Sequence, residues 1–270
     1  MVPEGERVLG FDPATRLESV IDTINAEHAE AELCILSGDL TDRGDEASYR
    51  RLRTLLERLS VPSHLMLGNH DRRAAFRQVF PDAHDDGHGF VQAALPLGSH
   101  RLILLDTLDE MRPSAGFLCP RRLAWLNGEF ERSPTIPTLL FLHHPPFPLG
   151  IEYFHAMLLE GGDALESLLD RHPQVLHTAF GHVHLSVSGR SGSRSFSATG
   201  GTCHPIRPVL AGMTASYVER PPCFDVILAD ANRIIVHSIE PLMPNALIAR
   251  EFADDIGGPG EFEIIRTPQI

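Results

Sequence analysis

The sequence predicts an α/β fold, in which buried strands alternate with amphipathic helices. Two observations support this prediction. Several short apolar runs, each of the length of a buried strand, end abruptly in polar residues, and the segments between them space their apolar residues as helices do. In an open α/β sheet, ligands bind beyond the carboxyl ends of the strands, so we expect the polar residues after these runs to lie together. The runs span residues 33–37, 65–67, 139–142 and 175–180.

The first third of the chain contains two predicted helices and two predicted strands. Residues 13–24 carry apolar side chains at helical spacing after a proline, and Asp12 stands where a helix cap is expected. Asp45 is predicted to cap a second amphipathic helix, which Pro62 ends. These helices flank the run at 33–37.

The remaining elements continue the alternation, and the late strands predict a second sheet. We see no internal repeat and no linker, so we expect one domain over residues 1–256, with a lid at 150–162 and a loosely held tail at 257–270. The predicted elements are helices at 72–80, 121–130 and 163–169, paired strands at 90–95 and 101–105, a strand-turn-strand at 185–199 and a hairpin at 224–228 and 234–237.

Composition excludes several function classes. The net charge of −13 argues against bulk nucleic acid or an anionic membrane as a partner. All basic residues are arginines, which excludes a lysine-containing phosphate-binding loop and a lysine Schiff base. The four cysteines show no paired spacing, and the first residues do not resemble a signal peptide, so we expect a cytoplasmic protein without disulfides.

The polar residues after the apolar runs are of the types that bind metal ions. Asp39 follows the first run and Asn69 the second, while His143, His182 and His184 follow the last two. Their mixed oxygen and nitrogen donors suit manganese, iron, zinc or cobalt. His182 and His184 are two residues apart, so in extended backbone both rings leave on the same side. An alternative for the second run is an ordinary strand-to-helix turn capped by Asp71.

At these motifs the chain resembles the calcineurin-like metallophosphoesterases. The matching segments are Gly38-Asp39, Gly68-Asn69-His70-Asp71, His143 and Gly181-His182-Val183-His184, in the order of that family. Residues 143–146 and the opening Gly-Glu-Arg-Val-Leu-Gly-Phe are most similar to the branch of class III cyclic nucleotide phosphodiesterases and glycerophosphodiesterases. The resemblance covers about residues 2–204 and implies a four-layer α/β/β/α sandwich.

The resemblance also implies roles for individual residues. It implies a binuclear centre in which two divalent cations flank a bridging hydroxide that attacks phosphorus. Asp39 matches the bridging ligand, His184 a ligand of one cation, and Asn69, His143 and His182 the ligands of the other. His70 matches the residue that contacts the phosphate and protonates the leaving group. His204 aligns with a substrate-side histidine, with a plain loop role as the alternative, and His144 is interpreted as a hydrogen-bonded neighbour that fixes its loop.

One part of the family pattern is missing. The family begins with a strand that ends in Asp-x-His, whose side chains complete the second metal site, and this sequence has no such segment. We interpret the omission as a truncated or misassigned start, and Asp12, the nearest replacement ligand, fits a helix cap better. The second cation would then keep only Asp39 and His184, which would impair activity, and an apolar edge would open beside the first strand.

The sequence therefore predicts a metal-dependent phosphodiesterase acting on a small diester, either a cyclic nucleotide or a glycerophosphodiester. The alternatives are a phosphomonoesterase with the same metal centre and a non-catalytic phosphate-binding protein that has lost its second metal. Small phosphodiesters are the expected partners, and the sequence leaves homo-oligomerisation open.

Overall fold

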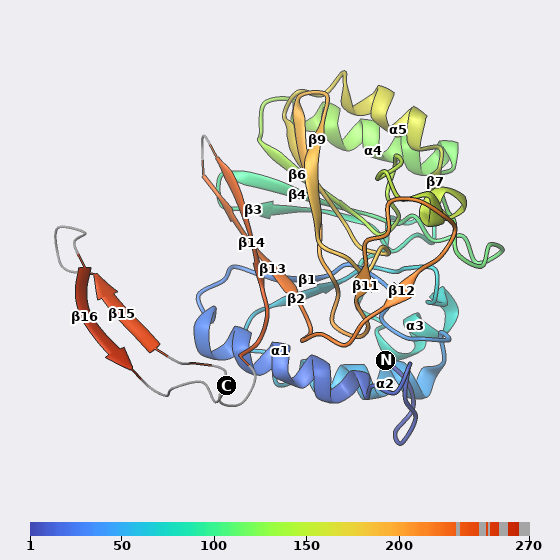
Figure 1. Cartoon of the computed structure of the whole chain (residues 1–270). Helices are drawn as coiled ribbons and strands as arrows, with labels where there is room; N and C mark the ends of the chain where they lie inside the picture. Colours follow the sequence, from blue (N-terminus) through green and yellow to red (C-terminus); the bar gives the residue numbers. More distant parts are fainter. Residues whose placement is uncertain (231–232, 243–246, 248, 254–258, 265–270) are drawn as a thin grey trace.

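The chain folds into four layers in the order helices, sheet, strands, helices (Figure 1). The computed structural model describes residues 1–230, 233–242, 247, 249–253 and 259–264. The larger sheet has six strands, and its four central strands are parallel while both edge strands are antiparallel to their neighbours. In spatial order the strands are β3 (Ala93–Leu97), β4 (His100–Leu105), β6 (Thr138–Leu142), β8 (Val175–Phe180), β10 (Arg194–Ala198) and β9 (Val187–Ser191).

Alternation along the strands gives the larger sheet two apolar faces. On β4, the side chain of Ile103 lies on one face of the sheet and packs in the core formed with helices α4 (Pro120–Arg132) and α5 (Gly162–Leu169). Leu102 and Leu104 pack with the opposite face. Because both faces are covered, the strands read as continuous apolar runs rather than as alternating ones. The side chains from the two helices in the first core are Leu126, Phe130, Leu165, Leu168 and Leu169.

The third layer consists of two strand pairs that cover the second face of the large sheet. The parallel pair is β1 (Cys34–Leu36) and β2 (Ser63–Leu65), and the antiparallel pair is β13 (Phe224–Ala229) and β14 (Ile234–Ile239). The core on this second face includes Leu102 and Leu104. The residues of the third layer that pack against this core include Ile35, Ile227 and Ile234. This double-sheet arrangement confirms the predicted α/β/β/α order.

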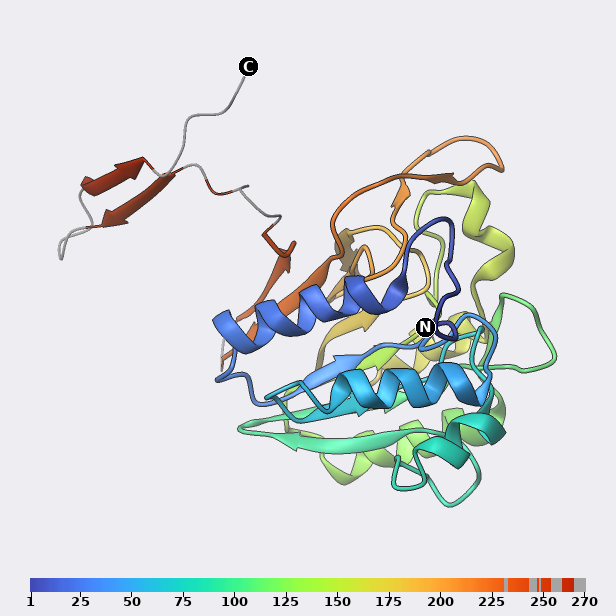
Figure 2. The ribbon, with the colours of Figure 1, turned by 90° about the horizontal axis from the view of Figure 1, so that it is seen from below.

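Helices α1 (Pro13–Glu27), α2 (Glu46–Leu56) and α3 (Arg73–Val79) belong to the fourth layer. Figure 1 shows α1 and α2 below β1 and β2, and Figure 2, seen from below, shows the two helices side by side. Both predicted caps are present, because Asp12 accepts a hydrogen bond from the Ala14 amide and Asp45 from the Ser48 amide. Asp12 also forms an ion pair with Arg51 at 3.1 Å, which fixes it to the helix layer.

The other elements are short. The segment expected to form a lid contains a 3₁₀ helix, η1 (Glu152–Met157), and strand β7 (Leu159–Glu160), which pairs with β5 (Gly116–Phe117). Part of the expected tail, β16 (Pro259–Ile264), pairs with β15 (Ala249–Ala253), while residues 257–258 and 265–270 lie outside the described residues. The remaining pair is β11 (Ile206–Arg207) and β12 (Ser216–Tyr217).

A cavity of about 820 Å³ lies between the two strand pairs of the third layer, and we call it the apolar slot. Ile35 of β1, Ile227 of β13, and Leu102 and Ala179 of the large sheet are among its lining residues. Within the described residues, β1 pairs only with β2 and β13 only with β14, so each has an edge without a partner strand. The strand before Asp39 therefore borders apolar surface, as the sequence predicted.

Three side chains outside the main core have defined surroundings. Trp125 on α4 is partly buried and packs against the first core. His84 stacks on His64, with 2.7 Å between Nε2 of His84 and Nδ1 of His64. Asp106 has a structural role, because it is buried against the Arg73 guanidinium at 2.7 Å. No helix among the described residues has the length and apolar character needed to cross a membrane.

Candidate active site

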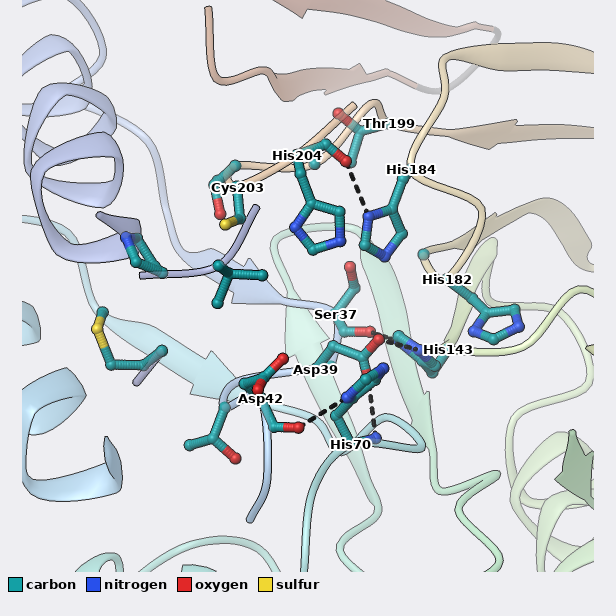
Figure 3. Close-up of a pocket in the computed structure, with 18 residues that line it drawn as sticks. Ser37, Asp39, Asp42, His70, His143, His182, His184, Thr199, Cys203 and His204 are labelled. Atoms are coloured by element: carbon teal, nitrogen blue, oxygen red, sulfur yellow. Dashed lines mark hydrogen bonds and ion pairs between the residues drawn. The ribbon is translucent and has the colours of Figure 1, made fainter. Parts of the chain in front are cut away.

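The ends of four strands bring the predicted ligands together. Strands β1, β2, β6 and β8 end shortly before Asp39, Asn69, His143 and His182, respectively. A cavity of about 130 Å³ opens at this edge. Figure 3 shows His184 and His204 on one side of the cavity and Asp39, His70 and His143 on the other. Among the cavity's lining residues are Asp39, Asp42, His70, His143, His182, His184, Cys203 and His204.

The backbone of three predicted ligands lies in the left-handed region. The φ angles are +52° at Asp39, +69° at His182 and +52° at His184. Few residues other than glycine adopt such angles, because Cβ approaches the neighbouring carbonyl oxygen. Three such residues in one site indicate that the chain adopts costly turns there to aim these side chains.

Gly68 allows the first two ligand loops to touch. A Cβ at this position would lie 2.2 Å from Oδ1 of Asp39 and 2.6 Å from Cε1 of His143. Real Cβ atoms do not approach other atoms so closely, and the nearest neighbours include the Asp39 backbone nitrogen. Only glycine therefore fits between the loop of Asp39 and the ring of His143.

Asp71 ties the loop that follows Asp39 to the loop that contains Gly68. Its buried carboxylate accepts hydrogen bonds from the amides of Gly68 and Leu40, from the amide and hydroxyl of Thr41, and from the Tyr49 hydroxyl, at 2.9–3.2 Å. Asp71 does not cap a helix, since the residue at the cap position of α3 is Arg72. The interpretation of this stretch as an ordinary capped turn is therefore wrong.

His143 and Asp39 face each other across the site. Nδ1–H of His143 donates to the Ser37 carbonyl at 2.8 Å, so Nε2 faces Oδ2 of Asp39 at 3.3 Å. Burial alone would lower the pKa of His143, but the negative charge of Asp39 and the hydrogen bond to the Ser37 carbonyl hold it above its usual value. Burial would likewise raise the pKa of Asp39, whereas His143 holds it well below the usual range. A positive charge between these atoms, a proton or a metal ion, is thus favoured.

Burial favours the neutral form of three other histidines of the site, His182, His184 and His204. Burial lowers the pKa of His182 to about 3 and that of His204 to about 4. Burial also lowers the pKa of His184, whose Nδ1–H donates to the His204 carbonyl at 3.0 Å. Neutral imidazole is the form that binds metal, and a hydrogen bond at Nδ1 leaves Nε2 as the ligand atom.

His70 stands at the open side of the cavity. Its ring is exposed, and Nδ1–H donates to the Asp42 carbonyl at 2.8 Å, which leaves Nε2 free to face a ligand in the cavity. The His70 amide also donates to Oδ1 of Asp39 at 3.0 Å, so the backbone of His70 helps to fix the carboxylate.

The residues present fit a divalent cation. Among the buried polar atoms of the described residues, Oδ1 of Asn69 and Nε2 of both His143 and His182 have no hydrogen-bond partner. The Asn69 amide nitrogen is fixed by the Pro113 carbonyl at 3.2 Å, so its oxygen is the free atom. Buried acceptors without partners are costly, and a cation bound by Asn69, His143, His182 and Asp39 would satisfy them.

Six of the predicted site residues line one cavity, namely Asp39, His70, His143, His182, His184 and His204, whereas Asn69 is not among its lining residues. Among the predicted ligands in the described residues, only Asp39 and His184 remain for a second cation. Asp12, the nearest replacement ligand in the sequence, does not line the cavity. Asp42 and Cys203 also line the cavity, and the sequence predicted neither of them. The one signal in the sequence was that Cys203 directly precedes the predicted site residue His204. His144 is hydrogen-bonded as predicted, since its Nδ1 lies 2.8 Å from the Thr107 hydroxyl oxygen.

Several known proteins are similar to this chain over most of its length. The chain is 36% identical over 239 residues to a probable cyclic nucleotide phosphodiesterase of Rhodopseudomonas palustris, covering 87% of each chain. It is 28% identical over 207 residues to a 3',5'-cyclic adenosine monophosphate phosphodiesterase of Pseudomonas aeruginosa, covering 76% of this chain and 73% of the relative. A glycerophosphodiester phosphodiesterase of Enterobacter lignolyticus is 27% identical over 224 residues, with 81% and 80% covered.

A solved structure and a family profile complete the comparison. The crystal structure of a dimetal phosphatase from Danio rerio has a similar fold, with a TM-score of 0.65 at 16% identity, covering 85% of this chain and 87% of the other. The profile described as calcineurin-like phosphoesterase matches residues 10–186, which include Asp39, Asn69, His143, His182 and His184. The chain therefore belongs to the calcineurin-like phosphoesterase family.

Proposed function

We propose that the chain is a metal-dependent phosphodiesterase whose substrate is a small cyclic nucleotide. The observation that carries the proposal is that Nε2 of His143 faces the Asp39 carboxylate at 3.3 Å, while two further buried atoms of predicted ligands, Oδ1 of Asn69 and Nε2 of His182, have no hydrogen-bond partner among the described residues. Relatives named as cyclic nucleotide phosphodiesterases support the substrate class. A glycerophosphodiester is the second candidate, supported by a relative named for that activity.

The residues divide into two groups by what they can do. Asp39, Asn69, His143 and His182 would hold one divalent cation, and Asp39 and His184 would contribute ligands to a second. Bound divalent cations polarise phosphoryl oxygens and lower the pKa of a bound water to near neutrality. The net charge of −13 makes such local positive charge necessary for binding a phosphate anion.

His70 performs the proton transfer in this proposal. Its Nδ1–H is engaged by the Asp42 carbonyl, so in the doubly protonated ring Nε2–H is the group that can hydrogen-bond the phosphate or donate a proton to the leaving oxygen. His204 lies against His184, with 4.4 Å between ring centroids, and is proposed to contact the substrate. His70 and His204 both line the cavity, whose volume of about 130 Å³ is enough to receive the phosphate group of the substrate.

The test compares four substrates with and without manganese: 3',5'-cyclic AMP, glycerophosphoethanolamine, bis-p-nitrophenyl phosphate and p-nitrophenyl phosphate. We expect cyclic AMP to be hydrolysed with the highest kcat/KM and the monoester with the lowest. Asn69→Ala should lower both manganese content and activity, whereas Asn127→Ala, on helix α4, should change neither. A folded protein that contains no metal after manganese loading would overturn the proposal, and preferential hydrolysis of the monoester would overturn the diester assignment.

A further inference from the structure

Tyr217 lies next to the proposed phosphate site, and the proposed reaction assigns it no task. Its ring centroid lies 5.5 Å from that of His204, which in turn lies 4.4 Å from that of His184. His184 and His204 line the cavity, whereas Tyr217 does not, and the Tyr217 side chain is about half exposed. The three rings therefore lead from a proposed metal ligand, past a proposed substrate contact, to the rim of the cavity.

The backbone fixes Tyr217 in this position. Tyr217 belongs to β12, where it is paired with Ile206 of β11. The Ile206 amide donates to the His184 carbonyl at 2.7 Å, and the Val218 amide donates to the Pro205 carbonyl at 3.1 Å. The hairpin of β11 and β12 is thus hydrogen-bonded at its base to the backbone of a proposed metal ligand. These backbone hydrogen bonds set the distance between Tyr217 and the cavity.

The far end of the hairpin is attached to the 3₁₀ helix η1. The Gly212 amide donates to the Glu152 carboxylate at 3.1 Å, and Figure 1 shows the loop between β11 and β12 reaching toward the segment before β7. Partial burial raises the pKa of the Tyr217 phenol, and so does the neighbouring hydroxyl of Tyr153, which also belongs to η1. The ring of Tyr217 is therefore supported by η1 at its hydroxyl end and by β11 at its backbone end.

An exposed ring at the rim of a phosphate site suits a nucleobase. Every nucleobase has a flat π-face, and bases stack on aromatic side chains with little dependence on their identity. In a mononucleotide the ribose separates the base from the phosphate, so a phosphate in the cavity places the base outside it. The described residues that line the cavity include no phenylalanine, tyrosine or tryptophan. Tyr217, in contact with His204, is such a ring at the rim.

We propose that Tyr217 stacks on the nucleobase of the substrate and makes the site selective for nucleotides over phosphate esters without a base. This proposal rests on the proposed function, because it takes the phosphate to lie in the cavity beside His204. Stacking of one base on an aromatic side chain contributes a gain in affinity of roughly 5- to 150-fold. The gain depends on the ring and not on the hydroxyl, so phenylalanine should replace Tyr217 and leucine should not.

The alternative is that the hairpin is a contact surface for another protein molecule. Leu210 and Met213, in the same hairpin, are also exposed, and exposed apolar groups that gather in one place often mark such contacts. A contact of this kind would depend on Leu210 as much as on Tyr217. It would not distinguish a ligand with a base from one without, and the position of Tyr217 beside His204 favours the nucleobase.

The experiment uses the full chain loaded with manganese and measures binding by calorimetry. The two ligands are adenosine 5'-monophosphate and ribose 5-phosphate, of which only the first has a base. We expect the unaltered chain and Tyr217→Phe to bind the nucleotide roughly 5- to 150-fold more tightly than the sugar phosphate, and Tyr217→Leu to bind both with nearly equal affinity. Leu210→Ala is the matched control, since Leu210 is an exposed apolar residue of the same hairpin, and it should retain the preference.

Equal affinities for the two ligands in the unaltered chain would overturn the proposal, and this result decides even if Tyr217→Leu does not fold. A preference that survives in folded Tyr217→Leu, or that is lost equally in Leu210→Ala, would overturn it as well. Hydrolysis of 3',5'-cyclic AMP, measured separately, tests the proposed function itself. Hydrolysis of the diester with equal binding of both ligands would mean that only the role of Tyr217 is wrong. Selective, Tyr217-dependent binding of the nucleotide without hydrolysis of any phosphodiester would support the role of Tyr217 and overturn the proposed function.

Discussion

At the scale of single residues, the site combines side chains whose tasks differ with their position. His143, which is buried, and His184, which is half-buried, donate Nδ1–H to backbone carbonyls and leave Nε2 for the proposed metal. His70 also donates Nδ1–H to a carbonyl, yet its ring is exposed to the cavity. Position relative to the cavity, and not the hydrogen-bond pattern, therefore separates the proposed proton donor from the proposed ligands.

The first residue-scale prediction concerns His70. Replacing it by alanine should lower kcat for a diester with a poor leaving group by roughly 10²–10⁴-fold, because the leaving oxygen then departs without a proton. Metal content should be unchanged, and the loss should be smaller for a nitrophenyl diester. Steady-state kinetics on both diesters measure this, with His88→Ala, an exposed loop histidine, as the control. Equal losses for both leaving groups would leave His70 a positioning role only.

A second prediction at this scale concerns acid stability. Burial lowers the pKa of His177 to about 4, while the unfolded chain should have a value near 6.5. Because the folded state keeps this imidazole neutral, His177 costs no stability above pH 6.5. As pH falls from 6.5 to about 4, protons bind the unfolded chain first, and the free energy of unfolding falls by about 3 kcal/mol.

Denaturant unfolding of the unaltered chain and of His177→Gln between pH 7.5 and 4 measures this difference. His177 is hydrogen-bonded to Ser195 at 2.8 Å and to Ser197 at 3.0 Å, so the variant should be less stable at neutral pH. The gap between the two proteins should narrow as pH falls. A stability difference that does not change with pH would show that His177 has the same pKa in the folded and the unfolded chain.

At the scale of elements, the site depends on the loops that continue from the strand ends. The strands before Asp39 and Asn69 are only three residues long, and the loops after them meet at Gly68 and are tied by Asp71. Short parallel strands have few backbone hydrogen bonds of their own. The hydrogen bonds of the Asp71 carboxylate therefore fix the two loops in place, which the short strands alone do not do.

Two glycine substitutions test this view of the elements. Gly68→Ala should destabilise the chain by about 1–3 kcal/mol and weaken metal binding, because the added methyl meets the Asp39 backbone. Gly128→Ala, inside α4 with nothing within 4 Å of the added methyl, should stabilise it by roughly 0.5–1 kcal/mol. Denaturant unfolding and metal titration of both variants measure these effects. Equal effects of the two substitutions would contradict the close packing at Gly68.

The sequence predicted some elements better than others, for physical reasons. Strand β8 and the caps Asp12 and Asp45 arise from local patterns, and the structure has them where predicted. The strand expected at 90–95 is instead β3 (Ala93–Leu97), because its bounds depend on pairing with β4. The ligand positions were recognisable because each follows an apolar run. The contact of His144 with Thr107 joins residues 37 apart, and no local pattern reveals it.

At the scale of the whole molecule, the four layers place the site at the seam between the two sheets. His143 and His182 come from the large sheet, while Asp39 and Asn69 come from the third layer, so a bound cation would link both layers. Metal binding should therefore stabilise the whole fold and not one loop. The apolar slot lies along the same seam and reaches Ser37, Gly38 and Asp39.

Filling the slot should stabilise the seam. Ala179 on β8 lines the slot and is nearly buried, so Ala179→Leu should add apolar contacts where space exists and raise stability by about 0.5–2 kcal/mol. Ala124→Leu, on the exposed side of α4, should have little effect. Thermal unfolding of both variants is the measurement. Destabilisation by Ala179→Leu would contradict this expectation. It would mean that the surrounding side chains move into the slot and leave no space for a leucine.

The left-handed backbone at Asp39, His182 and His184 has a consequence for how this chain can change over generations. At most positions alanine is tolerated better than glycine, but here glycine would relieve a conformational cost of about 1–2 kcal/mol that alanine retains. A lineage released from selection for catalysis should therefore accumulate glycine or asparagine at these positions. A screen for heat resistance alone should drive the protein the same way, toward stable chains that no longer bind metal.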